Sequence, residues 1–292
     1  MTSRLDVLKT YKLYIDGKFP RTESGRSTIV KSSKGTILAH TCNASRKDLR
    51  EAIEAARRAQ SGWGNATAYL RGQILYRMAE MIESRRDEFA SLISSVDKPA
   101  KGKKALSASA EVELSIDRLI YFAGFADKFA QVLGCNNPVS SPHYNFTVPE
   151  ASGVVCIVCP DSPSLLGLVS LVAPVLASGN TVVLNASETN PLPAVVLGEI
   201  CATGDVPAGV LNILTGSRAE LLPYIASHRE VDGVHAAGLT KTERELLRKG
   251  VAENIKRVVV REQVDWAARD AESAWWIEPF VEMKTIWHPA SV

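Results

Sequence analysis

Two patterns of hydrophobic and polar positions divide the chain near residue 150. Before that point, apolar residues recur three and four apart over long stretches, and shorter stretches alternate between polar and apolar residues. The first pattern predicts amphipathic helices and the second predicts half-buried strands. The predicted elements are a hairpin over 11–19, strands over 27–31 and 36–41, helices over 45–60, 69–96 and 107–131, a turn-rich linker over 134–142 and an extended piece over 143–148.

After Gly153, short apolar runs alternate with helical stretches. Val154 to Val158 and Thr181 to Leu184 are rich in β-branched residues and do not alternate, which predicts parallel strands buried on both faces. The other predicted elements are helices over 165–177, 192–202, 219–226 and 241–252 and strands over 210–214, 231–235 and 257–260. The predicted fold class is α/β, a Rossmann-type doubly wound parallel sheet after an N-terminal helical segment. Such sheets bind ligands beyond the carboxyl ends of their strands, here around Cys159 to Pro163 and Asn185 to Glu188.

The alternation of strands and helices stops after residue 261. Residues 262–278 are polar and contain three tryptophans, and Phe280 to Trp287 alternates like a final strand. The sequence therefore predicts three parts. They are 1–150 with the first strands, the helices and the linker, 151–262 with the Rossmann-like sheet, and 263–292 with the C-terminal strand.

Composition and charge narrow the classes of function. The chain has 292 residues with 46% hydrophobic and 23% charged residues, which is typical of a globular protein with a sizeable core. Its formal net charge is +2 with both signs interspersed, so neither nucleic acid nor a membrane surface is expected as a partner. The longest apolar stretch, Leu165 to Ala177, is too short to span a bilayer, and the N-terminus lacks a signal peptide's apolar core. These features predict a cytoplasmic location.

The five cysteines and five histidines do not form a recognisable metal or disulfide pattern. Cys156 and Cys159 make a C-x-x-C motif, but it lies in a predicted strand, where residues three apart point to opposite faces. No second Cys/His pair has matching spacing, so these cysteines are interpreted as core residues and no metal is expected.

Neither G-x-G-x-x-G nor G-x-x-x-x-G-K-[ST] occurs, so the two usual phosphate-binding loops are missing. Two other segments carry a family resemblance, GNTVVL at Gly179 to Leu184, followed by Glu188, and VPAGVLNILTG at Val206 to Gly216. With the order of the N-terminal elements, they make most of residues 11–261 resemble an aldehyde dehydrogenase. Phe280 to Trp287 is similar to that family's C-terminal oligomerisation strand.

The resemblance also shows where this chain departs from the family. The family has P-W-N after its first Rossmann strand, with the asparagine donating to an oxyanion, whereas this chain has Pro160-Asp161-Ser162. A lysine and a glutamate that hold the adenosine ribose correspond to Asn185 and Glu188, so one of the two is kept.

Two further departures lie in the later turns. A serine that receives the pyrophosphate is replaced by Leu239, and Arg261 stands where the family has the glutamate that acts as general base. Arginine cannot act as a base at neutral pH. Gly216 and Glu188 favour NAD binding and Asn185 and Leu239 oppose it, so weak or no NAD binding is expected. The candidate cofactor residues are Glu188, Asn185, Gly216 and Pro160, and no catalytic residue is predicted.

The largest departure is the short connection between the fifth Rossmann strand and the last strand. In the family a catalytic domain with the cysteine nucleophile lies there, and this layout is similar to the non-catalytic C-terminal half of family-sixteen aldehyde dehydrogenases. The resemblance implies an inactive subunit that binds a full-length, active aldehyde dehydrogenase, or self-associates through the C-terminal strand. The segment Trp266 to Trp287 is expected to take part in the contact, since aromatic residues often dominate interfaces.

Two other functions stay open at this point. One is an NAD(P)-dependent aldehyde oxidoreductase that is active only in a complex. The other is a nucleotide-binding or sensing module that uses the remaining cleft, with His235 and Asp161 as its polar groups. His235 ends its predicted strand, where it either faces the cleft, as this second hypothesis requires, or is packed, which is the more common arrangement for a single histidine.

Overall fold

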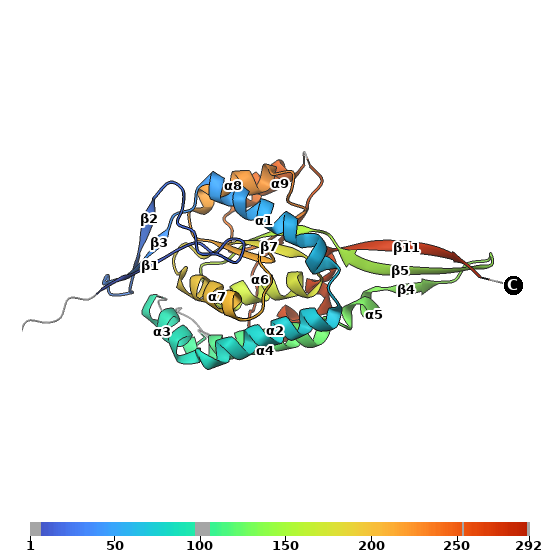
Figure 1. Cartoon of the computed structure of the whole chain (residues 1–292), viewed down its shortest axis with the longest axis horizontal. Helices are drawn as coiled ribbons and strands as arrows, with labels where there is room; N and C mark the ends of the chain where they lie inside the picture. The colour runs from blue at the N-terminus through green and yellow to red at the C-terminus, as the bar shows by residue number, and fades with distance from the viewer. Residues whose placement is uncertain (1–6, 97–105, 253, 291–292) are drawn as a thin grey trace, which may run out of the picture.

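A five-stranded parallel sheet forms the centre of the molecule, with helices on both faces (Figure 1). The computed structural model describes residues 7–96, 106–252 and 254–290. The strands are β6 (Val154–Val158), β7 (Thr181–Asn185), β8 (Leu211–Leu214), β9 (Gly233–Ala237) and β10 (Arg257–Arg261). Their spatial order is β10-β9-β6-β7-β8, so the chain crosses from β8 over to the other side of β6. The predicted doubly wound α/β fold is confirmed.

The helices cover the sheet in two layers (Figure 1). They are α1 (Arg46–Gly64), α2 (Ala68–Ser84), α3 (Arg86–Val96), α4 (Ala108–Phe125), α5 (Phe129–Leu133), α6 (Leu166–Ala177), α7 (Leu192–Thr203), α8 (Arg218–Ser227) and α9 (Lys241–Val251). One face carries α1, α8 and α9, and the other carries α6, α7, α2 and α4. On β6, Val155 and Ile157 join the core of the second layer, while Val154, Cys156 and Val158 join the core of the first. This is why the strand is apolar at every position.

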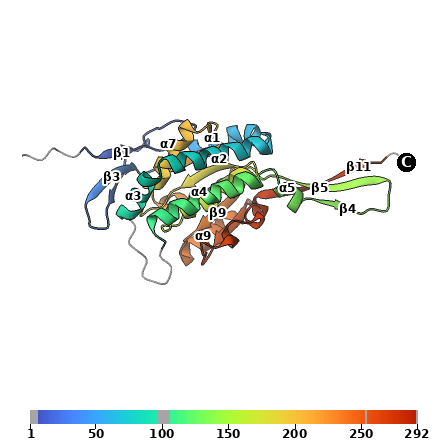
Figure 2. The same cartoon turned by 90° about the horizontal axis from the view of Figure 1, so that it is seen from below.

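A second sheet projects from one end of the molecule (Figures 1 and 2). It is antiparallel, in the order β11-β5-β4, and consists of β4 (Cys135–Asn137), β5 (His143–Ala151) and β11 (Val281–Pro289). β5 and β11 pair over their full length, from Ala151 with Val281 to His143 with Pro289. The interpretation of 134–142 as a linker was incomplete, because β4 adds an edge strand to this sheet.

The first strands form a separate small sheet of β1 (Lys9–Tyr11), β2 (Ser27–Lys31) and β3 (Ile37–Cys42). The predicted hairpin over 11–19 is reduced to one bridge between Ile15 and Lys18. Tyr14 instead pairs with Ile213 of β8, with hydrogen bonds in both directions of 3.0 and 2.7 Å. This pairing places the N-terminal segment along the edge of the central sheet.

The helix predicted over 69–96 is two helices, α2 and α3, that meet at Arg85. Arg85 leaves the helical conformation (φ −115°, ψ 20°) and forms ion pairs with Glu88 at 2.7 Å and with Glu199 of α7 at 2.8 Å. The break turns α3 toward α7. The helix predicted over 107–131 likewise ends at Phe125, before the short α5.

Residues 262–280, here called the connecting segment, join β10 to β11 through three short 3₁₀ helices: η1 (Arg269–Ala271), η2 (Ala274–Trp276) and η3 (Glu278–Phe280). Trp276, Ile277 and Phe280 are buried in the same core as the helices α2, α4 and α6. That core contains residues from all three predicted parts of the chain, and their boundaries remain a prediction.

Candidate functional site

The carboxyl ends of β6, β7 and β8 are linked by one residue, Arg218, the first residue of α8. Its guanidinium Nη2 lies 2.6 Å from Oδ1 of Asp161, which follows β6, and its backbone N–H donates to Oε1 of Glu188, which follows β7, at 2.7 Å. Arg218 is almost fully buried, whereas the side chain of Asp161 is 39% exposed. Three turns that are far apart in the sequence are therefore held together here; this arrangement is called the Arg218 bridge below.

Asp161 also organises the turn after β7. Its Oδ1 accepts hydrogen bonds from the backbone N–H groups of Glu188 at 3.0 Å and Thr189 at 3.3 Å and from the hydroxyl of Ser187 at 3.2 Å. Together with the guanidinium of Arg218, four donor groups surround a single carboxylate oxygen. Successive backbone N–H groups of this kind form a small anion-binding concavity.

The four predicted cofactor residues have clear structural surroundings. Glu188 satisfies a backbone N–H at the start of α8, where unpaired donors favour a carboxylate. At Gly216 a Cβ would lie 3.0 Å from the backbone N of Ala44, so the close approach of two chain segments requires glycine there. Asn185 is buried, and neither amide atom has a hydrogen-bond partner among the described residues. Pro160 is buried against two glycines: a Cβ would lie 2.4 Å from it at Gly167 and 3.1 Å at Gly238.

Glu188 and Gly216 line the same cavity, whereas Asn185 and Pro160 are not among its lining residues. Its volume is about 160 Å³. Small-molecule sites usually measure roughly 300–1,000 Å³, so this cavity is too small for a dinucleotide as it stands.

His235 is in the middle of β9 and fully buried, so the prediction that it ends its strand was wrong, and it is packed in the core instead of facing a cleft. The strand begins at Gly233, two residues later than the apolar run starting at Val231 suggested. Arg261 Nε donates to Nε2 of His235 at 3.1 Å, so the histidine's proton is on Nδ1, which donates to the carbonyl of Leu171 at 3.1 Å. Burial and then the charge of Arg261 hold the pKa of His235 well below its usual value.

Arg261, at the end of β10, is covered by the connecting segment. Its guanidinium lies 4.1 Å from the centre of the Trp276 ring, a cation–π contact, and Phe280 packs on His235 at 4.8 Å between ring centres. Asp161 and His235, proposed as the two polar groups of one cleft, are not brought together: one belongs to the Arg218 bridge and the other to this buried cluster.

Arg118 of α4 fixes the connecting segment to the helices. Its Nη1 donates to the carbonyl of Ala271 at 2.5 Å and to the hydroxyl of Ser170 at 2.8 Å, and its Nη2 donates to the carbonyl of Trp266 at 2.9 Å. Glu272 lies 3.5 Å from its Nε. A fully buried arginine with partners on three elements keeps its charge and defines the position of the segment. The sequence had given no signal for this role.

Four of the five cysteines are buried, and Cys135 on β4 is exposed. Burial raises the pKa of the Cys156 thiol to about 12 and raises that of Cys159 as well. A nucleophilic cysteine needs a depressed pKa, and these two have the opposite. Within residues 7–96, 106–252 and 254–290, no three His, Cys, Asp or Glu side chains form a group that could hold a metal ion.

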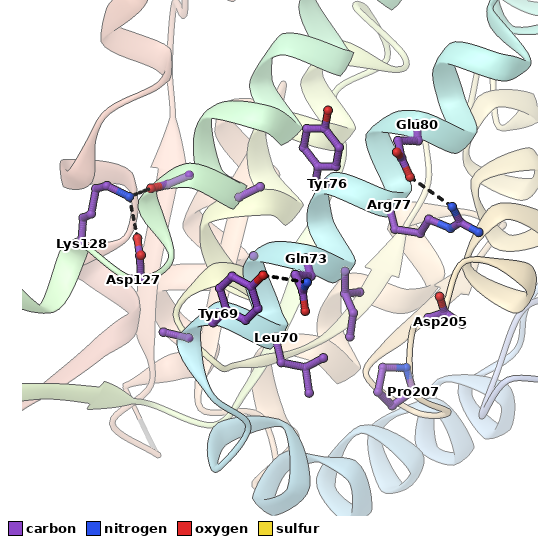
Figure 3. A pocket seen from close by; sticks show the side chains of 15 residues that line it. Tyr69, Leu70, Gln73, Tyr76, Arg77, Glu80, Asp127, Lys128, Asp205 and Pro207 are labelled. Carbon is purple, nitrogen blue, oxygen red and sulfur yellow. Dashed lines mark hydrogen bonds and ion pairs between the residues drawn. The ribbon is translucent and has the colours of Figure 1, made fainter.

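A larger groove of about 830 Å³ lies along α2 and α4, away from the sheet edge (Figure 3). Tyr69, Leu70 and Tyr76 of α2 are exposed beside it. Its charged side chains are paired locally, for example Arg77 with Glu80 at 3.2 Å. The groove was not predicted from the sequence, although these side chains lie outside the buried stripe of α2 and could have indicated it. No helix in the described part of the chain is long and apolar enough to cross a membrane.

A doubly wound parallel sheet with helices on both faces and polar residues gathered at its carboxyl edge defines a Rossmann-type α/β protein. Comparison with known proteins makes this more specific. The model of the aldehyde dehydrogenase family matches residues 19–262, and the chain belongs to this family.

Several relatives can be compared in detail. The chain is 31% identical to cytosolic 10-formyltetrahydrofolate dehydrogenase of Xenopus laevis over 260 residues, which is 88% of this chain and 28% of that protein. It is 32% identical to mitochondrial aldehyde dehydrogenase family 2 member B4 of Arabidopsis thaliana, over 85% of this chain and 46% of that protein. The aldehyde dehydrogenase of Bacillus cereus, solved as an NAD+ complex, superimposes with a TM-score of 0.79 at 28% identity, over 86% of this chain and 50% of that one. The chain thus spans about half, or less, of the length of these relatives.

Proposed function

We propose that this chain is a catalytically inactive aldehyde dehydrogenase-like subunit that acts as a structural or regulatory partner of an active NAD-dependent aldehyde dehydrogenase. One observation carries the proposal: the carboxyl end of β10 holds a half-buried arginine, Arg261, that is packed against the connecting segment. Arg261 stands there with His235 as its hydrogen-bond partner and Trp276 over its guanidinium. Arginine supplies no base at this position.

The projecting sheet supports the role of a partner subunit. β11 is an edge strand, and among the described residues its second edge pairs with no other strand. Edge strands recruit further strands by main-chain hydrogen bonds. Met283, Ile286 and Trp287 are exposed on β11, although Lys284 forms an ion pair with Glu150 across the sheet.

Only part of the segment Trp266 to Trp287, which was predicted to contact a partner, has tryptophan side chains exposed for such a contact. Trp276 is buried and Trp266 is partly buried in the core, so they are not free for a partner. Trp275, 65% exposed, and Trp287, 58% exposed, remain available. We expect these two side chains to contribute to the interface, with Trp287 next to the β11 edge.

The experiment is co-expression with a full-length aldehyde dehydrogenase from the same organism, followed by size exclusion and an NADH assay with several aldehydes. The isolated chain is expected to produce no NADH and to elute with the dehydrogenase. Trp287→Ser should raise the Kd of the complex at least about tenfold, so that less of the chain elutes with the dehydrogenase. This is a usual effect for an aromatic interface residue. Tyr69→Ser, an exposed aromatic on α2, is the matched control and should leave the Kd unchanged. Aldehyde oxidation by the purified chain, or separate elution of the two proteins, contradicts the proposal.

A further inference from the structure

The carboxylate of Asp161 lies in a built anion-binding position at the edge of the sheet. Its Oδ1 receives the backbone N–H groups of Glu188 and Thr189, the hydroxyl of Ser187 and the guanidinium of Arg218, all within 3.3 Å. These donors come from the turn after β7 and from the start of α8. They are the groups that a parallel sheet of this type offers to an anionic ligand beyond its strands.

The arginine in this position is not fully satisfied by the protein. Arg218 is 4% exposed, and its Nε and Nη2 make no hydrogen bond of good geometry among the described residues, although Nη2 forms the ion pair with Asp161. A guanidinium has five N–H donors in one plane, and it can bind two oxygens of a phosphate or carboxylate at once, in a bidentate pair. The single oxygen of Asp161 uses these donors incompletely. The position therefore has unused capacity for a larger oxyanion.

Access from solvent is also present. The side chain of Asp161 is 39% exposed, so replacing it by a smaller residue opens the position to solvent. The neighbouring cavity of about 160 Å³, lined by Glu188 and Ser217, is large enough for a phosphate group although it is too small for a dinucleotide.

We propose that Asp161 is an internal substitute for a ligand phosphate. Its carboxylate fills an oxyanion site made by Arg218, Ser187 and the backbone of Glu188 and Thr189, and thereby excludes phosphate-bearing nucleotides from this edge of the sheet. The inference concerns anion binding and does not depend on the partner proposed above, so the two can fail separately.

The test is removal of the internal carboxylate. Asp161→Ala leaves Arg218 without its counter-ion, and inorganic phosphate should then stabilise the protein. We expect a rise in Tm of about 2–4 °C when phosphate is about tenfold above its Kd, and no rise for the unaltered chain. ADP-ribose, used in parallel, distinguishes a site for free phosphate from one that accepts a nucleotide diphosphate.

Three further variants make the result interpretable. The double variant Asp161→Ala with Arg218→Met should lose the gained stabilisation, because the guanidinium is gone while its aliphatic stem remains. Asp161→Asn keeps an amide oxygen in the position and should stay unresponsive. Glu220→Ala removes the carboxylate partner of Arg26, which lies 2.6 Å away in a more exposed ion pair, and should not create phosphate binding.

If Asp161→Ala does not fold, Asp161→Ser serves in its place, since serine is small and polar enough for an exposed turn. The proposal is wrong if folded Asp161→Ala or Asp161→Ser shows no stabilisation by phosphate or ADP-ribose. It is also wrong if the unaltered chain is stabilised equally, or if the double variant keeps the effect.

Discussion

The buried histidine of β9 makes the stability of this protein depend on pH in a defined direction. His235 is fully buried and neutral, and the charged group that faces it is Arg261, which hydrogen-bonds to its Nε2. Phe280 and Trp276 enclose the ring on the other sides. Adding a proton would remove the acceptor of Arg261 and place two positive charges side by side in the core.

The size of the effect follows from the difference between the folded and unfolded pKa values. In the unfolded chain His235 has a pKa of about 6.5, whereas burial and Arg261 hold the folded value well below this. Above about pH 6.5 both states are neutral and the stability is complete. As the pH falls below this value the unfolded state binds a proton that the folded state does not, and stability is lost by about 1.4 kcal/mol per pH unit. At about pH 5.0 the loss from His235 alone is ~2 kcal/mol, provided that the folded pKa is still lower.

Urea unfolding at about pH 7.5 and pH 5.0 measures this loss. The comparison is with His235→Gln, whose amide offers one donor for the carbonyl of Leu171 and one acceptor for Arg261 and does not titrate. His228, whose pKa is also lowered by partial burial, and the carboxylates contribute equally to both proteins, so the difference between the two losses belongs to His235. Equal losses of stability in the two proteins would refute the buried, neutral histidine.

Two other substitutions test the connecting segment and the cysteines. Arg118→Met should lower the free energy of unfolding by about 3–5 kcal/mol, because the carbonyls of Ala271 and Trp266 and the carboxylate of Glu272 lose a buried partner. The same change at exposed Arg77 should cost less than about 0.5 kcal/mol in urea titrations, and similar values for the two would contradict the role of Arg118. A thiol reagent should label Cys135 rapidly in the folded protein and the buried cysteines after unfolding, and Cys135→Ser should remove the fast phase. Fast labelling that survives this change would mean that a buried cysteine is accessible.

The central sheet could be predicted from the sequence because its strands are buried on both faces. Continuous β-branched runs at β6 and β7 need no information from distant residues, and neither does the helix at Ser45, where the predicted cap is present as a capping box with Asp48. The predictions that were wrong depend on long-range partners. Arg85 interrupts a good helical pattern at the point where it pairs with Glu199 of α7, a partner that the local pattern does not show.

The sequence predicted where the candidate site lies, and it did not predict which side chains contact one another there. The turns after β6 and β7 were expected to carry polar groups, and the structure brings Asp161 and Glu188 together there. Arg218, which links them, resembles any polar residue in the first turn of a helix when only the sequence is considered. Its partner Asp161 was expected to be a polar group of the cleft, whereas its Oδ1 accepts hydrogen bonds from the turn after β7 and pairs with a buried cation. Local spacing cannot show such pairs, since they form across separate loops.

Arg218 and Arg261, at the carboxyl end of the sheet, each depend on the residues around them. Departures from the family pattern therefore have to be considered together with the neighbouring residues that accompany them. Arg261 is compatible with a half-buried position because His235 accepts its hydrogen bond and Trp276 packs against its guanidinium. Arg218 is compatible because Asp161 compensates its charge. Burial of a cation without a partner would lower the stability by several kcal/mol. Replacing either arginine alone by an acidic residue would place a negative charge among groups that are arranged around a positive one. Arg261, the buried His235 and the connecting segment are therefore parts of one packed arrangement, and a change at one of them affects the packing of the others.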